Sequence, residues 1–155
     1  MNQLRRKFIK LSGTAGALAL AGVAGLLRQG NAFAAAWNKP AFESKAVAEA
    51  LKSLGATSLV ESKDIAITAP DIAENGAVVP VAVTSRLPNT QSISIIAEKN
   101  PFPLTSTYDI NGADAYVSVR LKIGQTSNVR AIVKADGKFY TAFKEVKITI
   151  GGCGG

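Results

Sequence analysis

The apolar residues that follow residue 35 show two different spacings, of which the first is helical. Between residues 44 and 54 they recur every three or four positions, at Ala46, Val47, Ala50, Leu51 and Leu54. Gly55 follows, at the position where helices commonly end. This segment therefore predicts one short amphipathic helix. Three upstream residues are expected to pack against the domain as an apolar anchor: Trp37, Pro40 and Phe42.

Beyond Gly55 apolar and polar residues alternate, which is the pattern of a β-strand with one buried face. The alternation is clearest over residues 115–123, where every odd position is apolar. Further strands are predicted at residues 79–83, 93–97 and 129–135, and weaker ones at 65–68 and 104–110. The pair Asp136-Gly137 predicts a two-residue hairpin turn before a last strand that extends to residue 150, because glycine accepts the positive φ of such turns.

The last predicted strand changes its pattern near residues 144–145. The apolar positions have one parity before this point and the other parity after it: Thr141 and Phe143, then Val146, Ile148 and Ile150. A bulge or a crossing between sheets would explain the change. Seven short strands with turns between them predict an all-β fold, an immunoglobulin-like antiparallel β-sandwich of about seven strands with a short N-terminal helix.

The composition restricts the chemistry that the side chains can perform. The chain has no His, one Cys and one Met. A Ser-His-Asp triad, a Cys-His pair and a His-based metal site are therefore excluded, and soft ligands for copper, zinc or an iron–sulfur cluster are almost absent. We expect a protein that is not an enzyme, with no catalytic residue, no metal site and no cofactor.

The first 34 residues have the order of a secretory signal peptide. A basic segment that includes Arg5 and Arg6 is followed by an uncharged stretch over residues 11–27 and by the small residues Ala32 and Ala34 before Ala35. The stretch of 17 residues is short and only mildly apolar for a membrane span of about 20 residues. We therefore expect cleavage near Ala35 and no permanent membrane anchor.

The basic segment also indicates the export route. The pair Arg5-Arg6, followed by Lys-Phe-Ile-Lys, resembles the twin-arginine signal Arg-Arg-x-Phe-Leu-Lys, which implies export of a folded protein, with a bound partner, to the periplasm. Without residues 1–34 the net charge falls from +7 to +2, since 13 basic residues then face 11 acidic ones. No basic run with interleaved aromatic residues remains, so a nucleic-acid partner is not expected.

The chain ends in a cysteine framed by glycines, Gly151-Gly152-Cys153-Gly154-Gly155. Glycine has the widest backbone freedom and no side chain, so this segment is expected to be a flexible arm, thin enough for a narrow channel. Fully extended, its five residues reach about 17 Å. The chain thus divides into a cleaved leader (1–34), a sandwich domain (35–150) and an arm (151–155). Without an activating neighbour, Cys153 suits a covalent carrier better than a catalyst.

Other interpretations of the tail stay open. The arm could be incidental to a periplasmic β-sandwich binding module, or it could dimerise through a disulfide of Cys153. The terminal Gly154-Gly155 is also similar to the ends of ubiquitin-like sulfur carriers, which hold sulfur as a thiocarboxylate at the last glycine. Those carriers need cytoplasmic ATP and have a different, helix-containing fold.

The leader, the predicted strands and the terminal Gly-Gly-Cys-Gly-Gly together resemble the SoxY family, the carrier subunits of the periplasmic thiosulfate-oxidising (Sox) system. The segments at residues 72–81, 99–103 and 122–127 also resemble this family. The resemblance implies that Cys153 bears thiosulfate-derived intermediates. It implies a heterodimer with SoxZ and transient docking to three enzymes: the haem c-type cytochrome SoxAX, the manganese-dependent hydrolase SoxB and, where present, the molybdenum sulfane dehydrogenase SoxCD.

Overall fold

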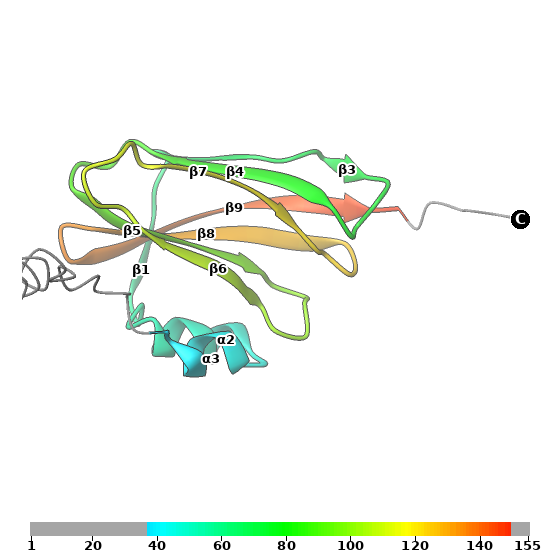
Figure 1. Cartoon of the computed structure of the whole chain (residues 1–155), viewed down its shortest axis with the longest axis horizontal. Coiled ribbons are helices and arrows are strands. Elements are labelled where there is room, and N and C mark those ends of the chain that lie inside the picture. Colours follow the sequence, from blue (N-terminus) through cyan, green and yellow to red (C-terminus); the bar gives the residue numbers. More distant parts are fainter. Residues whose placement is uncertain (1–36, 150–155) are drawn as a thin grey trace, which may run out of the picture. The chain divides into compact units, whose positions relative to one another are not determined.

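A computed structural model describes residues 37–149 of the chain (Figure 1). The chain divides after Trp37, and the helices and strands below belong to the unit that begins at Asn38. The predicted leader, with Arg5 and Arg6, and the predicted arm at residues 151–155 lie outside the described residues. Neither helix of the described part is long and apolar enough to cross a membrane.

In the described part of the chain two short helices precede the strands, where the sequence predicted one. The predicted helix is α3 (Val47–Ser53), which ends as expected: Gly55 has φ +77°, and the N–H of Ala56 donates to the carbonyl of Leu51 at 2.8 Å. The additional helix is α2 (Lys39–Glu43). Asn38 caps α2, since its side-chain oxygen accepts from the N–H of Ala41 at 3.3 Å, and its amide nitrogen donates to Ser53 at the end of α3.

Within residues 37–149 nine strands form two sheets, which confirms the immunoglobulin-like β-sandwich. The larger sheet has the order β1 (Leu59–Glu61), β9 (Lys138–Ile148), β8 (Ser127–Ala135), β5 (Thr90–Ala97), β6 (Leu104–Asp109), and β3 (Ile72–Ala73) also pairs with β9. The smaller sheet has the order β2 (Ile65–Thr68), β4 (Val79–Ser85), β7 (Tyr116–Leu121). The seven predicted strands are all present. The short strands β1 and β3, which pair parallel with β9, are additional.

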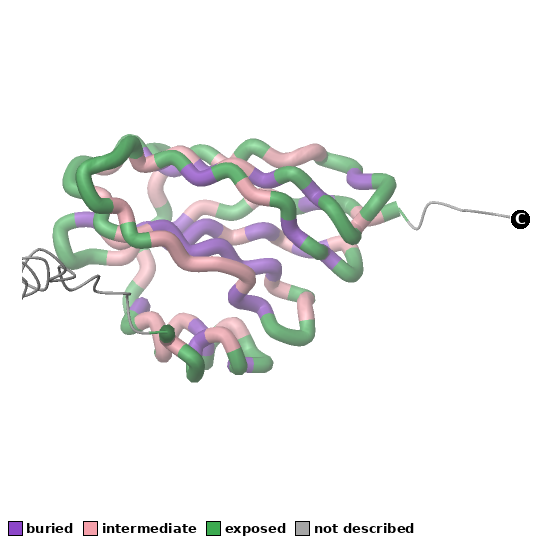
Figure 2. Tube along the Cα trace, viewed as in Figure 1, coloured by how far each residue is buried: buried purple, intermediate pink, exposed green. Residues whose placement is uncertain are grey.

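The larger sheet is buried on both faces, whereas the alternating pattern predicted one outward face for each strand. Its inner face, which includes Ile95 and Val133, packs against the smaller sheet, which contributes Val81. All three residues are fully buried. Its outer face carries a second apolar cluster under α2 and α3, which includes Ile96 and Ile132. Figure 2 shows buried residues along the central strands of this sheet. The helices therefore complete the fold by covering one side of the sandwich.

The change of pattern predicted near residues 144–145 is not a bulge or a crossing. Strands β8 and β9 pair without a shift from Ser127↔Val146 to Ala135↔Lys138. The inward positions of β9 are the even ones throughout, and Lys144 occupies one of them. Its ammonium group leaves the apolar interior to bind the carbonyl of Ala69 at 2.6 Å and the carboxylate of Asp71 at 2.9 Å. The same parity of β9 therefore faces inward along the whole strand, and the charged residue at one inward position made the sequence pattern look as though it changed.

The predicted apolar anchor before the helix is only partly present. Phe42 packs against the cluster under the helices, and Pro40 lies in the first turn of α2. Trp37 is 68% exposed, and its role as an anchor stays a prediction.

Candidate functional site

The predicted site residues themselves, Cys153 with Gly151, Gly152, Gly154 and Gly155, lie outside the described residues. Their placement stays a prediction. The structure describes the end of the sandwich from which this segment leaves, and Thr149 is the last described residue. Figure 1 shows this end of the sandwich at the tip of β9, beside β3 and the loop between β7 and β8.

The end of β9 is held by hydrogen bonds from both sides. On one side β3 pairs with it, Ile72 opposite Lys147 and Ala73 opposite Ile148. The N–H of Thr149 donates to the carbonyl of Ala73 at 3.1 Å. On the other side the N–H of Ile148 donates to the hydroxyl of Thr126 at 3.0 Å. The backbone is therefore fixed as far as Thr149, four residues before Cys153.

The loop after β3 contacts the loop after β7 at Gly76. The N–H of Ile123 donates to the carbonyl of Gly76 at 2.7 Å. A Cβ atom at position 76 would lie 2.4 Å from the carbonyl oxygen of Ile123 and 3.0 Å from the side chain of Ile148. Glycine is required here, because the backbones of the two loops approach too closely for any side chain.

Asn100 joins the loop after β5 to the loop after β7. Its side-chain nitrogen donates to the carbonyl of Lys122 at 2.8 Å, and its side-chain oxygen accepts from the N–H of Gly124 at 3.2 Å. The side chain of Gln125 donates to the carbonyl of Lys99 at 3.2 Å, and the hydroxyl of Ser127 accepts from the N–H of Lys99 at 3.0 Å. These bonds fix the two loops to one another.

Three segments distant in the sequence thus meet at the end of β9. They are the segments at residues 72–81, 99–103 and 122–127, the same ones that carried the resemblance. Nothing in the sequence indicated that these segments lie together, or that Gly76, Asn100 and Thr126 join them. The only feature of the sequence that could have indicated these contacts is the presence of small and amide side chains in the loops.

Two hollows are open to solvent in the described part of the chain. One, of about 210 Å³, lies at the end of β9 and is lined by Glu74–Ala77, Lys122–Gly124, Ile148 and Thr149. The other, of about 430 Å³, lies between the end of β1 and the middle of β9, lined by residues 61–63 and 141–143. Within residues 37–149 no group of three His, Cys, Asp or Glu residues is arranged to hold a metal ion.

The chain is similar to a solved structure with which it shares substantial identity. The chain is 39% identical to the structure of the sulfur carrier protein SoxY from Chlorobium limicola f thiosulfatophilum, with a TM-score of 0.58; the match covers 64% of this chain and 93% of that one. A superoxide reductase (neelaredoxin) from Ignicoccus hospitalis matches at 21% identity and a TM-score of 0.49, over 55% of this chain and 79% of that one. No curated protein sequence matches significantly.

The comparison with protein families covers most of the described part and the predicted arm. The model of the family described as "Sulfur oxidation protein SoxY" matches residues 50–153. This range contains all nine strands and all three segments that meet at the end of β9, and its last residue is Cys153. The chain belongs to the SoxY family of sulfur oxidation proteins.

Proposed function

We propose that this protein is a covalent carrier of sulfur substrates in thiosulfate oxidation, and that Cys153 holds the thiosulfate-derived intermediates and presents them to partner enzymes. One observation carries the proposal. The family match ends at Cys153, the only cysteine of the chain, and the sandwich holds the backbone as far as Thr149, four residues before it. The 39% identical protein from Chlorobium is a sulfur carrier.

The proposed cycle begins with two steps at the sulfur of Cys153. In the first, the thiol and thiosulfate lose one proton and two electrons to the haem enzyme SoxAX, and a sulfur–sulfur bond forms to give a cysteine S-thiosulfonate. In the second, the hydrolase SoxB adds water to the terminal sulfonate sulfur, releases sulfate and two protons, and leaves a cysteine persulfide anion on the carrier. Where SoxCD is present, it oxidises the remaining sulfur. The carrier supplies attachment and reach, and the enzymes supply catalysis.

The partner and the compartment belong to the same proposal. We infer that the protein forms a heterodimer with SoxZ, and that the signal at Arg5 and Arg6 exports it folded to the periplasm. SoxZ carried along with the folded subunit would explain why a chain that is expected to bind no cofactor uses this route. Replacing both arginines by lysine should leave the precursor in the cytoplasm, which fractionation of the cells would detect.

The sandwich fold speaks against the thiocarboxylate alternative, because ubiquitin-like carriers have a helix-containing fold of a different kind. A binding module with an incidental tail is separated from a carrier by deletion of residues 151–155. A binding module would keep its function after this deletion, and a carrier would lose all of it.

Thiosulfate turnover by the reconstituted system tests the proposed function. We expect Cys153→Ser to reduce turnover to background and to leave the urea midpoint of unfolding and the binding of SoxZ unchanged, because the substitution removes one sulfur atom outside the sandwich. Turnover near the wild-type rate with Cys153→Ser would refute the carrier function.

A further inference from the structure

The distance between Thr149 and Cys153 limits where a partner enzyme can bind. This limit rests on the proposed function and on the expectation that the thin arm carries Cys153 into a channel of the enzyme. Four residues of extended chain span at most about 14 Å between Cα atoms. The mouth of such a channel must therefore lie within about 14 Å of Thr149 whenever Cys153 is inside. The residues around Thr149 then contact that mouth.

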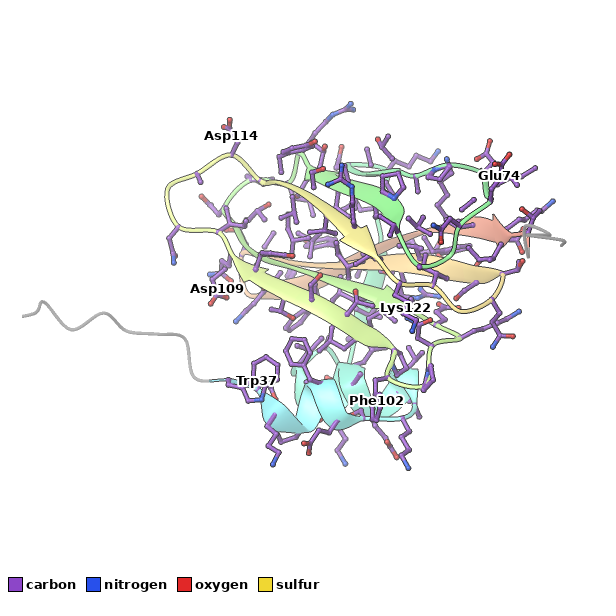
Figure 3. All side chains as sticks on the ribbon, turned by 45° about the vertical axis from the view of Figure 1, so that its right-hand side comes forward. Trp37, Glu74, Phe102, Asp109, Asp114 and Lys122 are labelled. Carbon is purple, nitrogen blue, oxygen red and sulfur yellow. The ribbon has the colours of Figure 1, made fainter. Side chains whose placement is uncertain are left out.

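Four exposed residues in the loops around Thr149 form what we call the arm-end surface: Glu74, Lys99, Phe102 and Lys122. Glu74 and Lys122 line the same hollow as Thr149, and Asn100 ties the loop of Lys99 and Phe102 to Lys122 and Gly124. Figure 3 shows Glu74 beside the end of β9, Lys122 on the same side of the sandwich, Phe102 beside the helices, and Asp109 and Asp114 toward the opposite end. Because the loops are bonded together, this surface is preorganised for docking.

The charges of the arm-end surface are not neutralised within the sandwich. The neighbouring carboxylates are engaged elsewhere, Asp71 with Lys144 at 2.9 Å and Glu98 with Arg130 at 2.6 Å. Lys99 and Lys122, in contrast, form no ion pair with residues 37–149. Two unpaired ammonium groups against the single carboxylate of Glu74 favour an acidic partner surface.

Phe102 adds an apolar contact to this surface. Its ring is 51% exposed, while the next residue, Pro103, is fully buried and anchors the loop. An exposed aromatic ring on a fixed loop is typical of an anchor residue in a protein–protein interface.

We propose that the arm-end surface is the docking site for the haem enzyme that loads Cys153, at the mouth of the channel that Cys153 enters. Lys99 and Lys122 face carboxylates at the mouth of the channel, and Phe102 enters an apolar depression beside it. The lysines increase the rate of encounter, and the aromatic contact holds the complex while Cys153 reacts.

The rate of enzyme-catalysed loading tests the role of charge. The full mature protein, purified with its partner subunit, is loaded by the haem enzyme with thiosulfate, and Lys122→Glu is compared with Lys138→Glu. Lys138 is an exposed lysine in the hairpin at the opposite end of the sandwich. We expect kcat/KM to fall about tenfold for Lys122→Glu at low salt and less at about 0.5 M salt, because salt screens exposed charges. Lys138→Glu should load like the wild type.

A second pair of variants tests the aromatic contact. Phe102→Ala should reduce kcat/KM severalfold at every salt concentration. Phe143→Ala is the matched control, because Phe143 is also 51% exposed but lies six residues before Thr149 on β9, about 20 Å along the strand. Alkylation of Cys153 by a small neutral reagent should proceed at the same rate in all variants, which shows that the thiol itself is unaffected.

The outcomes separate this proposal from the function on which it rests. The docking proposal is wrong if Lys122→Glu and Phe102→Ala load like the wild type, or if the control variants lose as much activity, while loading still requires Cys153. Loading of Cys153→Ser at the wild-type rate would overturn the carrier function and the docking proposal together.

Discussion

The two ends of the sandwich are built by different means. At the end opposite Thr149 the strands are joined by short local turns with positive φ, at Asn89 (51°), Gly112 (66°), Asp136 (48°) and Gly137 (73°). The side chain of Asn89 donates to Asp136 there, at an exposed position. At the end of β9 the loops are bound to one another more extensively, by the backbone contact at Gly76 and by the side chains of Asn100, Gln125 and Thr126.

The loops at the two ends differ in what they surround, because the bonded loops at the end of β9 adjoin Thr149, the last described residue. A turn with positive φ reverses the chain and needs no contact with other loops. Bonds between loops that lie far apart in the sequence fix the surface from which the last segment leaves. Substitutions at the end of β9 should therefore alter sulfur transfer, whereas substitutions at the opposite end should alter stability slightly or not at all.

The largest effect is expected in the arm itself. Replacing Gly152 and Gly154 by Val adds bulk and β-branching on both sides of Cys153, so the arm should enter a narrow channel poorly. We expect enzyme-catalysed loading to slow by about tenfold to a hundredfold, as misplaced reacting groups do, with an unchanged urea midpoint. Loading at the wild-type rate would mean that the arm does not pass through a tight channel.

Gly76 provides the sharpest test of the end of β9. In Gly76→Ala the new Cβ would meet the carbonyl oxygen of Ile123 at 2.4 Å, so the loops must separate. We expect a loss of about 2 kcal/mol in the free energy of unfolding, measured by urea titration, together with slower loading. Gly124→Ala is the control in the facing loop, because its Cβ would have no atom within 4 Å. Equal stability of the two variants would contradict the close approach.

A smaller effect is expected for Asn100→Ala. The substitution removes two hydrogen bonds between loops, and both are exposed to water, so the unfolding free energy should fall by only about 1 kcal/mol. Loading should nevertheless slow severalfold, because Lys99 and Phe102 lose their fixed position. A loss of stability without any change in loading would mean that the loop contact stabilises the fold but plays no part in docking.

The smallest effect is expected at the opposite end. Asp136→Gly removes the hydrogen bond from Asn89 but places glycine at φ 48°, a conformation that glycine adopts easily. The unfolding free energy should change by less than about 0.5 kcal/mol, and loading should not change. Slower loading in this variant would mean that both ends of the sandwich affect sulfur transfer.

The sequence predicted the strands better than the contacts between them. Alternation identified all seven long strands because each has a continuous apolar face, and Gly55 marked the end of α3. The strands β1 and β3 were missed because three and two residues are too short to show a period. The change of pattern in β9 was misread because Lys144 lies at an inward position but extends its charge to Ala69 and Asp71.

The candidate site was predictable only in part. Cys153 and its glycines were identified because they form a local pattern. The surroundings of Thr149 depend on pairings between residues far apart, such as Asn100 with Lys122, 22 positions away, and Thr149 with Ala73. Local spacing carries no information about such pairs, so the meeting of the three loops was visible only in the fold.

The most direct test of the central claim is the intact mass of the mature protein isolated from cells that oxidise thiosulfate, before and after reduction, beside Cys153→Ser. The carrier function predicts sulfur or sulfonate adducts that reductant removes, that map to Cys153 and that are absent from the variant. An unmodified thiol, or a disulfide dimer alone, would contradict it.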